Sequence, residues 1–343
     1  MTAPLVYVLV INWNGRAHLR ECFDSLLASS HPNAKFLLVD NGSIDDSVDY
    51  MKREFGYEKR IEILRIEKNA GWSGGNNAGI EYALRAGADY IFLLNNDTAT
   101  GPDAIAHLVA AAEADARIGA LAPKILLYDH PQLLNSVGLD AALTGAAWDR
   151  GLGQKDGPEW NEVRSVAGVC GAAMFLRAGV LRETGLLPSD FEIYLDDLDL
   201  CLRIWSAGYT IQTCPAAVIR HKFSATMGEG KWARRKYYLN TRNRLRVILR
   251  NYPATHATRI LGHYVHAECR AIGRAVLDGA FSCAWAHIRA SASGLLYLPH
   301  ALKARRARGG PKGSFWGLLR SDVHFFPGVE IPGGSTVKDE MRV

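Results

Sequence analysis

The chain lacks the features expected of a secreted or membrane-spanning protein. Its six cysteines show no Cys-x-x-Cys spacing and no regular framework, which is typical of reduced, mostly buried thiols in a cytosolic protein. No apolar run approaches the roughly 18 residues that a membrane span needs, and the best candidate, residues 294–302, is too short. The N-terminus has neither the basic start nor the small-residue cleavage site of a signal peptide. These absences predict a cytoplasmic protein.

Two common nucleotide-binding loops are also missing. A dinucleotide-binding domain needs Gly-x-Gly-x-x-Gly after its first strand, where this chain has Asn12-Trp13-Asn14-Gly15. The glycine-rich segment 71–79 comes after the third predicted strand and contains no Gly-Lys-Ser/Thr. Its backbone N–H groups suit a phosphate or sugar at a helix N-terminus. A tight strand-to-helix turn explains the same glycines equally well.

Apolar runs and amphipathic segments alternate along the first part of the chain. The apolar runs predict buried strands at residues 5–11, 36–39, 61–66, 90–94 and 118–124. Helical spacing of apolar residues lies between them, at 15–29, 47–55, 76–85 and 103–114. This alternation predicts an α/β fold with parallel strands joined by right-handed crossovers.

The pattern changes twice further along the chain. Residues 128–163 are rich in Gly, Pro, Asp and Trp and predict a long loop. Regular structure is expected to return at 171–176, with a helix at 197–207 and strands at 209–213 and 216–220. We expect a catalytic region over residues 1–230 and a basic, mainly helical region over residues 231–343.

The most informative stretch is Asn95-Asn96-Asp97, which directly follows the apolar run 90–94. In parallel sheets, ligands bind at the carboxyl ends of such strands. Asp97 offers one hard, charged oxygen to a divalent cation and leaves the other coordination positions to phosphate oxygens. Capping of the helix that begins near Gly101 explains the same residues equally well.

Polar and glycine-rich motifs follow one another in a distinctive order. They are Asn12-Trp13-Asn14-Gly15, Val39-Asp40-Asn41-Gly42-Ser43, Asn69-Ala70-Gly71-Trp72, Gly74-Gly75-Asn76-Asn77-Ala78-Gly79, Leu94-Asn95-Asn96-Asp97-Thr98, Gly171-Ala172-Ala173-Met174, Asp196-Asp197-Leu198-Asp199-Leu200 and Pro215-Ala216-Ala217-Val218-Ile219-Arg220-His221. In this order they resemble family 2 glycosyltransferases of the GT-A fold, most of all the bacterial rhamnosyltransferase-like branch. The resemblance covers about residues 4–250. It implies a Rossmann-like, mainly parallel sheet flanked by helices, with a helical C-terminal extension.

The resemblance implies a site for a nucleotide-sugar donor, a UDP- or dTDP-sugar. Asp40 corresponds to the carboxylate that accepts the N–H of a uracil or thymine ring. Asn12 and Trp13 would line the base and ribose pocket, with Trp13 as a stacking face. Asn77 and Asn96 complete the implied donor-binding set.

A divalent metal, Mg²⁺ or Mn²⁺, is implied beside the donor diphosphate. Asp97 corresponds to the last acid of the family's Asp-x-Asp site, and His221 to a further ligand of the metal or diphosphate. Asn95 stands where many relatives have the first acid. We expect this change to weaken metal affinity modestly, because an amide oxygen coordinates without charge.

Asp197 corresponds to the catalytic base, which takes the proton of an acceptor hydroxyl as its oxygen attacks the anomeric carbon. The metal would stabilise charge on the leaving diphosphate, and one displacement inverts the anomeric configuration. Gly171, Asp196 and Asp199 would lie on the acceptor side. Acids at a helix start also cap it and offset its dipole. Crowding three of them is expected to raise the pKa of at least one.

The chain departs from the family pattern near the expected acceptor side. Leu187-Pro188-Ser189 replaces a common Phe-Asp-Glu, Glu192 stands at a usually aromatic position, and Asp196 replaces the commoner Glu. The expected acceptor is a glycan or lipid-linked saccharide of cell-surface polysaccharide synthesis. Its identity does not carry over from the family.

Positive charge is concentrated after residue 230. Residues 231–250 contain eight basic side chains and no acidic one, within a chain of net charge +5. With their interleaved aromatics they suit an anionic membrane surface, where each basic residue contributes about 1 kcal/mol. A solvated helix packed on the catalytic region explains the composition equally well.

No nucleic-acid recognition motif accompanies the charge, so no nucleic-acid partner is expected. The Gln-x-x-Arg-Trp motif of processive relatives is also missing, which predicts one sugar per encounter.

Two other functions stay open on the residues alone. A nucleotidyltransferase also pairs a parallel sheet with acidic metal ligands, but it needs a basic, glycine-rich loop near the N-terminus. An inactive sugar-nucleotide-binding scaffold would keep the fold, although the retention of both Asp97 and Asp197 disfavours this. The donor sugar and the oligomeric state are not determined by the sequence.

Overall fold

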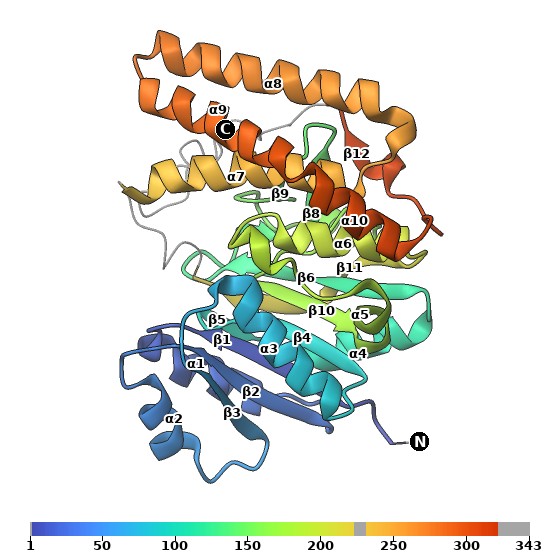
Figure 1. Cartoon of the computed structure of the whole chain (residues 1–343). Coiled ribbons are helices and arrows are strands. Elements are labelled where there is room, and N and C mark those ends of the chain that lie inside the picture. Colours follow the sequence, from blue (N-terminus) through green and yellow to red (C-terminus); the bar gives the residue numbers. More distant parts are fainter. Residues whose placement is uncertain (1, 223–230, 322–343) are drawn as a thin grey trace.

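A large, mainly parallel sheet forms the centre of the N-terminal part of the molecule (Figure 1). The computed structural model describes residues 2–222 and 231–321. Within them the sheet runs in the order β3-β2-β1-β4-β10-β6-β11-β5, and β7 pairs with β6. Its strands are β1 (Val6–Asn12), β2 (Ala34–Asn41), β3 (Ile61–Ile66), β4 (Tyr90–Asn95), β5 (Thr98–Thr100), β6 (Ile118–Leu127), β7 (Leu134–Ser136), β10 (Ala173–Arg177) and β11 (Thr210–His221).

The first four strands are parallel to one another, as the alternating pattern predicted. β10 lies antiparallel between β4 and β6, so it brings a later part of the chain into the centre of the sheet. The prediction of an α/β fold with a mainly parallel sheet is confirmed.

Helices cover both faces of this sheet. They are α1 (Arg16–Leu27), α2 (Ser47–Phe55), α3 (Gly71–Arg85), α4 (Ala104–Ala114), α5 (Ala178–Thr184) and α6 (Asp196–Ser206). Alternate residues of a strand point to opposite faces. Val8 of β1 accordingly packs in one core with α1, α2 and α4, whereas Leu9 packs in another with α3, α5 and α6. Burial on both faces explains why the strands are continuous apolar runs.

Three sequence-based boundaries are wrong. The helix expected from residue 76 begins at Gly71, so the glycine-rich segment is its first two turns rather than a loop. The loop expected over residues 128–163 contains β7, β8 (Leu139–Ala142) and β9 (Ala147–Asp149). The two strands expected at 209–213 and 216–220 are one strand, β11, with a register shift between Cys214 and Val218.

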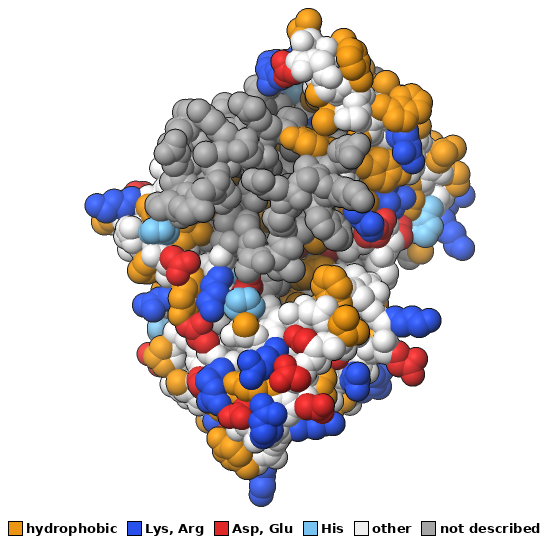
Figure 2. Space-filling view, turned by 90° about the vertical axis from the view of Figure 1, so that its left-hand side faces the viewer, with side chains coloured by type: hydrophobic (Ala, Val, Ile, Leu, Met, Phe, Trp, Pro, Cys, Tyr) orange, Lys and Arg blue, Asp and Glu red, His pale blue; other side chains and the backbone are white. Residues whose placement is uncertain are grey.

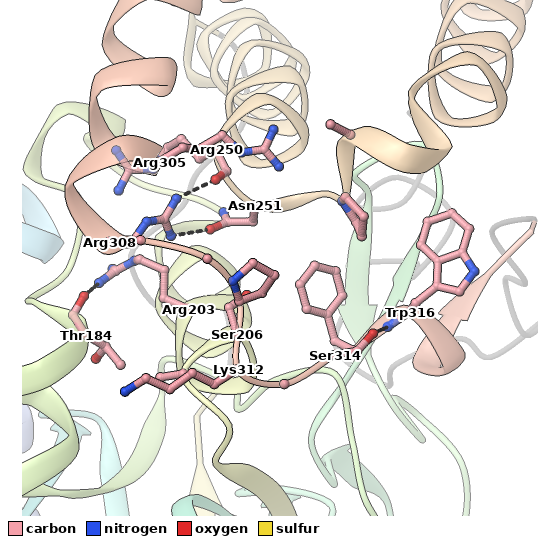
Figure 3. Close-up of a pocket in the computed structure, with 18 of the residues that line it drawn as sticks. Thr184, Arg203, Ser206, Arg250, Asn251, Arg305, Arg308, Lys312, Ser314 and Trp316 are labelled. Atoms are coloured by element: carbon pink, nitrogen blue, oxygen red, sulfur yellow. Dashed lines mark hydrogen bonds between the residues drawn. The ribbon is translucent and has the colours of Figure 1, made fainter.

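The C-terminal helices are α7 (Lys231–Asn251), α8 (Ala257–Leu277), α9 (Phe281–Leu296) and α10 (Leu298–Arg308), and the short strand β12 (Leu319–Arg320) then pairs with β8. Of these helices, α7 packs on α6, α9 and α10 pack on α7, and α8 packs on α9. Leu198 of α6, Val247 of α7 and Tyr264 of α8 share one apolar core. α10, the end of α7 and the segment after α10 enclose a cavity of about 720 Å³ (Figure 3). The division at residue 230 stays a prediction.

Three of the six α7 arginines expected to face a membrane are buried. Arg242, Arg244 and Arg250 are buried, and Arg244 forms a 3.0 Å ion pair with Glu268. For these residues the membrane-facing prediction is wrong. The side chain of Arg234 lies outside the described residues.

Many of the exposed apolar side chains belong to α8 and α9. Figure 2 shows hydrophobic side chains gathered on the upper part of the molecule, where these helices lie. The exposed set on the two helices includes Leu261, Val265, Leu277, Phe281, Trp285 and Ile288. Among the described residues, no helix combines the length and hydropathy needed to cross a bilayer.

Gly79 allows α3 to lie close against the sheet. A Cβ at this position would sit 2.8 Å from Val39 Cγ2 and 3.1 Å from Leu9 Cδ1. We expect Gly79→Ala to lower the free energy of unfolding by about 1–3 kcal/mol through overpacking. Gly262→Ala, in α8, is the matched control: its Cβ would meet nothing within 4 Å, so it should stabilise by about 0.5–1 kcal/mol. Chemical denaturation measures both; a Gly79→Ala protein as stable as the native one would contradict the close packing.

Candidate active site

The carboxyl ends of β1, β2 and β4 bring the predicted donor residues together. Asn12 pairs with Asp40 across β1 and β2, and Ile11 pairs with Asn95 across β1 and β4. Residues from three separate motifs therefore lie at one edge of the sheet, where parallel α/β sheets bind ligands.

Asn12 connects these motifs through its amide group. Its Nδ2 donates to Asp40 Oδ1 at 3.4 Å and to Ser43 Oγ at 3.2 Å, while its Oδ1 accepts from Asn96 Nδ2 at 2.7 Å. A Cβ on Gly15 would lie 2.0 Å from Asn96 Nδ2, so this glycine is required for the contact. Sequence reasoning assigned no role to Ser43, although it belongs to one of the recognised motifs.

Asp40 is fully buried, and its Oδ2 has no hydrogen-bond partner among the described residues. The guanidinium of Arg65 is 3.9 Å away. A buried carboxylate oxygen without a donor is costly, so this atom is suited to accept an N–H from a ligand. Trp13, which follows Asn12, is 46% exposed and offers a ring face beside the same edge.

Asp97 and His221 form a buried pair. His221 Nε2 lies 3.2 Å from Asp97 Oδ1, and its Nδ1 lies 2.6 Å from Asn135 Oδ1. The pairing of β11 with β5 sets His221 opposite Thr98, next to Asp97. Burial disfavours ionisation of Asp97, but the hydrogen bond and charge of His221 outweigh it and lower the pKa of that carboxyl.

The spacing of this pair suits a shared divalent ion. Adjacent ligands of an octahedral ion at about 2.1 Å lie about 3 Å apart, close to the observed separation. A carboxylate oxygen and an imidazole nitrogen are acceptable ligands for Mn²⁺. Among the described residues, no group of three or more His, Cys, Asp or Glu side chains is placed to hold a metal ion, so the Asp97–His221 pair offers two candidate ligands.

Asp197 is the second residue of α6 and lies beside the same edge of the sheet. Its Oδ2 accepts from the backbone N–H of Gly171 at 3.1 Å and its Oδ1 from that of Leu198 at 2.7 Å. Burial and the neighbouring charge of Asp196 raise the pKa of Asp197 to about 7. Asp196 is itself buried and accepts the hydroxyl of Ser73, and burial raises its pKa too.

Backbone and side-chain contacts connect Asp197 to the end of β4. Asn95 N–H donates to Ala172 O at 3.0 Å, next to Gly171. Trp72 Nε1 donates to Asn95 Oδ1 at 3.3 Å, and a Cβ on Gly171 would lie 2.9 Å from the Trp72 ring. The base candidate and the metal candidates thus belong to one continuous site.

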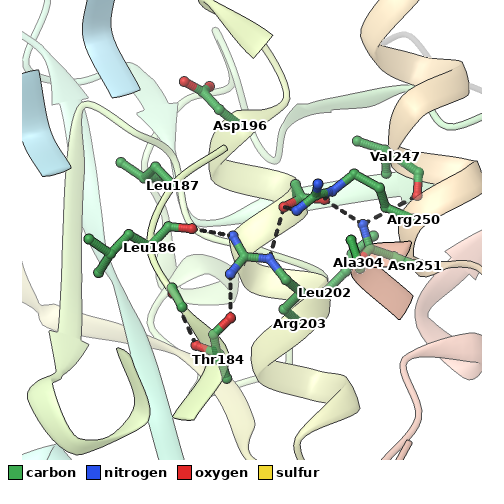
Figure 4. Close-up of polar contacts among 12 residues, drawn as sticks. Thr184, Leu186, Leu187, Asp196, Leu202, Arg203, Val247, Arg250, Asn251 and Ala304 are labelled. Carbon is green, nitrogen blue, oxygen red and sulfur yellow. Dashed lines mark hydrogen bonds and ion pairs between the residues drawn. The ribbon is translucent and has the colours of Figure 1, made fainter. Parts of the chain in front are cut away.

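Asp199 does not face this site. It is fully buried, and its carboxylate accepts from Arg203 Nε at 2.9 Å, Arg250 Nε at 2.7 Å and Asn251 Nδ2 at 2.7 Å. Figure 4 shows Arg203, Arg250 and Asn251, the three donors. Burial opposes ionisation, but the two guanidiniums outweigh it and lower the pKa of Asp199 to about 2. The prediction of an acceptor-side role for Asp199 is wrong, because helical geometry turns it away from Asp197 and into the contact with α7.

Asn77 has a structural role in place of the expected donor contact. Its Nδ2 donates to Leu187 O at 2.9 Å, and its Oδ1 accepts from Leu187 N–H at 3.0 Å. Both ends of the amide are therefore occupied by the loop between α5 and α6.

The loop before Asp196 is strained and held by α7. Glu192, Tyr194 and Leu195 have φ of 68°, 72° and 62°, and each such residue costs of order 1–3 kcal/mol. Asn243 Nδ2 lies 2.9–3.0 Å from the carbonyl oxygens of Phe191, Ile193 and Tyr194.

Arg242 adds to this contact. It donates to Glu192 Oε1 at 2.9 Å and to Phe191 O at 2.9 Å. Sequence reasoning missed both side chains, since it treated residues 231–250 as a charged surface. A buried Arg-Asn pair cannot be told from an exposed one by composition.

Comparison with known proteins gives two family matches. The model of "Glycosyl transferase family 2" matches residues 7–130. That of "Glycosyl transferase family group 2" matches residues 90–300, more than half of the chain.

Individual relatives are distant. An N-acetylglucosaminyl-diphospho-decaprenol L-rhamnosyltransferase of Mycobacterium tuberculosis is 27% identical over 240 residues, covering 64% of this chain and 76% of that protein. An uncharacterised protein of Sinorhizobium fredii is 26% identical over 66% of this chain, which spans 25% of its length. The structure of GalNAc-T7 with UDP, GalNAc and Mn²⁺ superposes with a TM-score of 0.61 at 15% identity, over 79% of this chain and 51% of that one. These matches confirm the GT-A fold.

Replacing Asp199 should strongly destabilise the protein. Its pKa is about 2 in the folded state and about 3.9 when unfolded, so its stabilisation is complete above pH 4 and is lost as the pH falls towards 2, an effect of about 2–3 kcal/mol. At pH 7, Asp199→Asn should cost about 3–5 kcal/mol, because two buried guanidiniums lose their carboxylate. Urea unfolding across this pH range measures it, with the exposed Asp278→Asn as control. Equal acid sensitivity in the native protein and Asp199→Asn would contradict the assignment.

Replacing Asn243 should loosen the loop before Asp196. Asn243→Ala removes the donor shared by three carbonyls and should cost about 1–3 kcal/mol. Hydrogen–deuterium exchange should speed up over residues 191–198 and stay unchanged in the sheet. Asn240→Ala on the same helix serves as control. Unchanged exchange over 191–198 in Asn243→Ala would show that α7 does not hold the loop.

Proposed function

This chain belongs to glycosyl transferase family 2, and we propose that it is an inverting enzyme that transfers one sugar from a UDP- or dTDP-sugar to a hydroxyl group. The observation that carries the proposal is Asp197, a carboxylate whose pKa is raised to about 7 at the edge of the sheet that also holds Asp40 and the Asp97–His221 pair. A general base works best when its pKa lies near the working pH.

The donor nucleotide would bind at the ends of β1 and β2. The buried Asp40 Oδ2 suits the ring N–H of uracil or thymine, and the exposed face of Trp13 suits stacking. Asn12 holds this carboxylate in place by donating to Asp40, and it accepts a hydrogen bond from Asn96, which follows β4.

The donor diphosphate would lie against Asp97 and His221. The two side chains would hold a divalent metal, which supplies a Lewis acid for the charge that grows on the leaving diphosphate. The contact between His221 and Asn135 orients the imidazole ring so that Nε2 faces Asp97.

Asp197 would take the proton of the acceptor hydroxyl as that oxygen forms a bond to the anomeric carbon. The bond from that carbon to the diphosphate breaks on the opposite face, so one displacement inverts the configuration. The N–H groups of Gly171 and Leu198 hold the carboxylate in position. Asp196, next to it and buried, keeps its pKa high through its charge.

The acceptor would be a glycan or a lipid-linked saccharide, and rhamnose is one candidate sugar. Support comes from the mycobacterial relative, whose name gives a rhamnosyl transfer to a decaprenol-linked acceptor. The exposed apolar side chains of α8 and α9 favour work at a membrane surface, with these helices rather than α7 as the contact.

Asp197→Asn and Asp97→Ala test the site. Release of nucleoside diphosphate from UDP- and dTDP-sugars with Mn²⁺ should fall about 10²–10⁴-fold in Asp197→Asn, with donor binding retained. The native kcat/KM should rise with pH up to about 7, since Asp197 must lose its proton, and this limb should vanish in Asp197→Asn. Asp97→Ala should lose the Mn²⁺-dependent part of the Tm shift caused by UDP or dTDP.

The same assays separate the alternatives. Unchanged turnover in both variants would overturn the site assignment. Pyrophosphate release from a nucleoside triphosphate would favour a nucleotidyltransferase, and donor binding without turnover in the native protein would favour a scaffold.

A further inference from the structure

A cavity lies against the C-terminal half of α6. Its volume is about 720 Å³, within the range of small-molecule sites. The lining comes from the C-terminal half of α6, the end of α7, α10 and the segment 309–316. None of the residues assigned to donor, metal or base lines it, and the proposed reaction leaves it unused.

The walls of this cavity carry an excess of positive charge. Its basic lining residues are Arg203, Arg250, Arg305, Arg308 and Lys312. Figure 3 shows Arg250, Arg305 and Arg308 together on one side of it. The charge of Asp199 offsets those of Arg203 and Arg250. The charge of Glu183 offsets that of Lys312, whose Nζ lies 2.7 Å from Glu183 Oε1.

Arg305 and Arg308 are left without a carboxylate among the described residues. Arg308 donates to three neutral oxygens, those of Ala304, Asn251 and Arg250, while Arg305 donates to Tyr252 O. Burial lowers the pKa of Arg308 to about 10. Two partly buried guanidiniums in this position favour an external anion, because desolvated charge is costly unless paired.

The two guanidinium groups and the aromatic wall of the cavity indicate which kind of anion would bind. Guanidinium groups bind phosphate through paired hydrogen bonds and prefer it to a simple halide. The opposite side of the cavity is apolar and aromatic, with Phe315 and Trp316, and the Trp316 ring stacks on His256 at 3.9 Å. Such a wall suits the organic part of a phosphorylated compound.

We propose that this cavity binds a small phosphorylated molecule through Arg305 and Arg308, at a site separate from the nucleotide-sugar site. Its occupant contacts the C-terminal half of α6, the helix that begins at Asp196-Asp197. The inference does not depend on the proposed reaction.

Inorganic pyrophosphate in EDTA is the direct probe, since chelation removes any metal-dependent binding at Asp97. We expect a dose-dependent rise in Tm of at least about 2–4 °C. Arg305→Gln and Arg308→Gln should each weaken the fitted affinity about tenfold, the effect of one charge-assisted contact. Arg306→Gln, an exposed arginine on the same helix, and Asp97→Asn should retain native affinity.

A second experiment, with lipid vesicles, distinguishes a free phosphorylated molecule from a lipid headgroup. Phosphatidylcholine vesicles with phosphatidic acid should protect no better than those without it if the occupant is a free molecule. Protection by phosphatidic acid that disappears in Arg305→Gln and Arg308→Gln would assign the same site to a lipid headgroup. Absence of any shift with either probe, or equal shifts in native protein and both variants, would overturn the proposal. Arg305→Gln also removes a hydrogen bond to the carbonyl oxygen of Tyr252. The Tm of this variant without ligand is therefore measured as the control for correct folding.

Discussion

One buried carboxylate connects α6, which packs on the central sheet, to α7 of the C-terminal region. Asp199 accepts hydrogen bonds from Arg203 on its own helix and from Arg250 and Asn251 on α7. Without that charge two guanidiniums would be buried unpaired, which costs several kcal/mol. The interaction therefore sets how α7 lies on α6, and α7 in turn holds the strained loop before Asp196 through Asn243.

The same helix turn separates a structural acid from a catalytic candidate. Asp197 and Asp199 are two residues apart, and a two-residue step on a helix points to different sides. Two arginines next to Asp199 lower its pKa to about 2. Burial and the neighbouring carboxylate of Asp196 raise the pKa of Asp197 to about 7. A pair of acids driven apart in this way is a known signature of divided roles. Here one acid stabilises the fold, and the other is the candidate for the general base of the proposed reaction.

Much of the fold was predictable because it depends on short-range patterns. Continuous apolar runs predicted strands buried on both faces, and the alternation with helices predicted a parallel sheet. The order of the motifs along the chain predicted one site for Asp40, Asp97 and Asp197, and this assignment stays a prediction. Failures came where a pattern had two solutions. The glycines at 71–79 suit a turn or, as found, a helix packed tightly on another element, and Asp199 suits either an exposed cap or a buried ion pair.

The amino-acid order alone was enough to predict the fold class and the family, and it indicated the strand ends where we propose that the donor binds. These depend on the periodicity of apolar residues and on motifs that lie within short stretches of the sequence. The tertiary structure alone decided which acids and arginines face a ligand and which face each other. Asp199 and Arg250 are 51 residues apart, and whether such charges are solvated, paired or left in excess depends on packing between distant segments. That is why Arg242, Arg244 and Arg250 are buried in contacts within the protein, although the sequence suggested a charged surface.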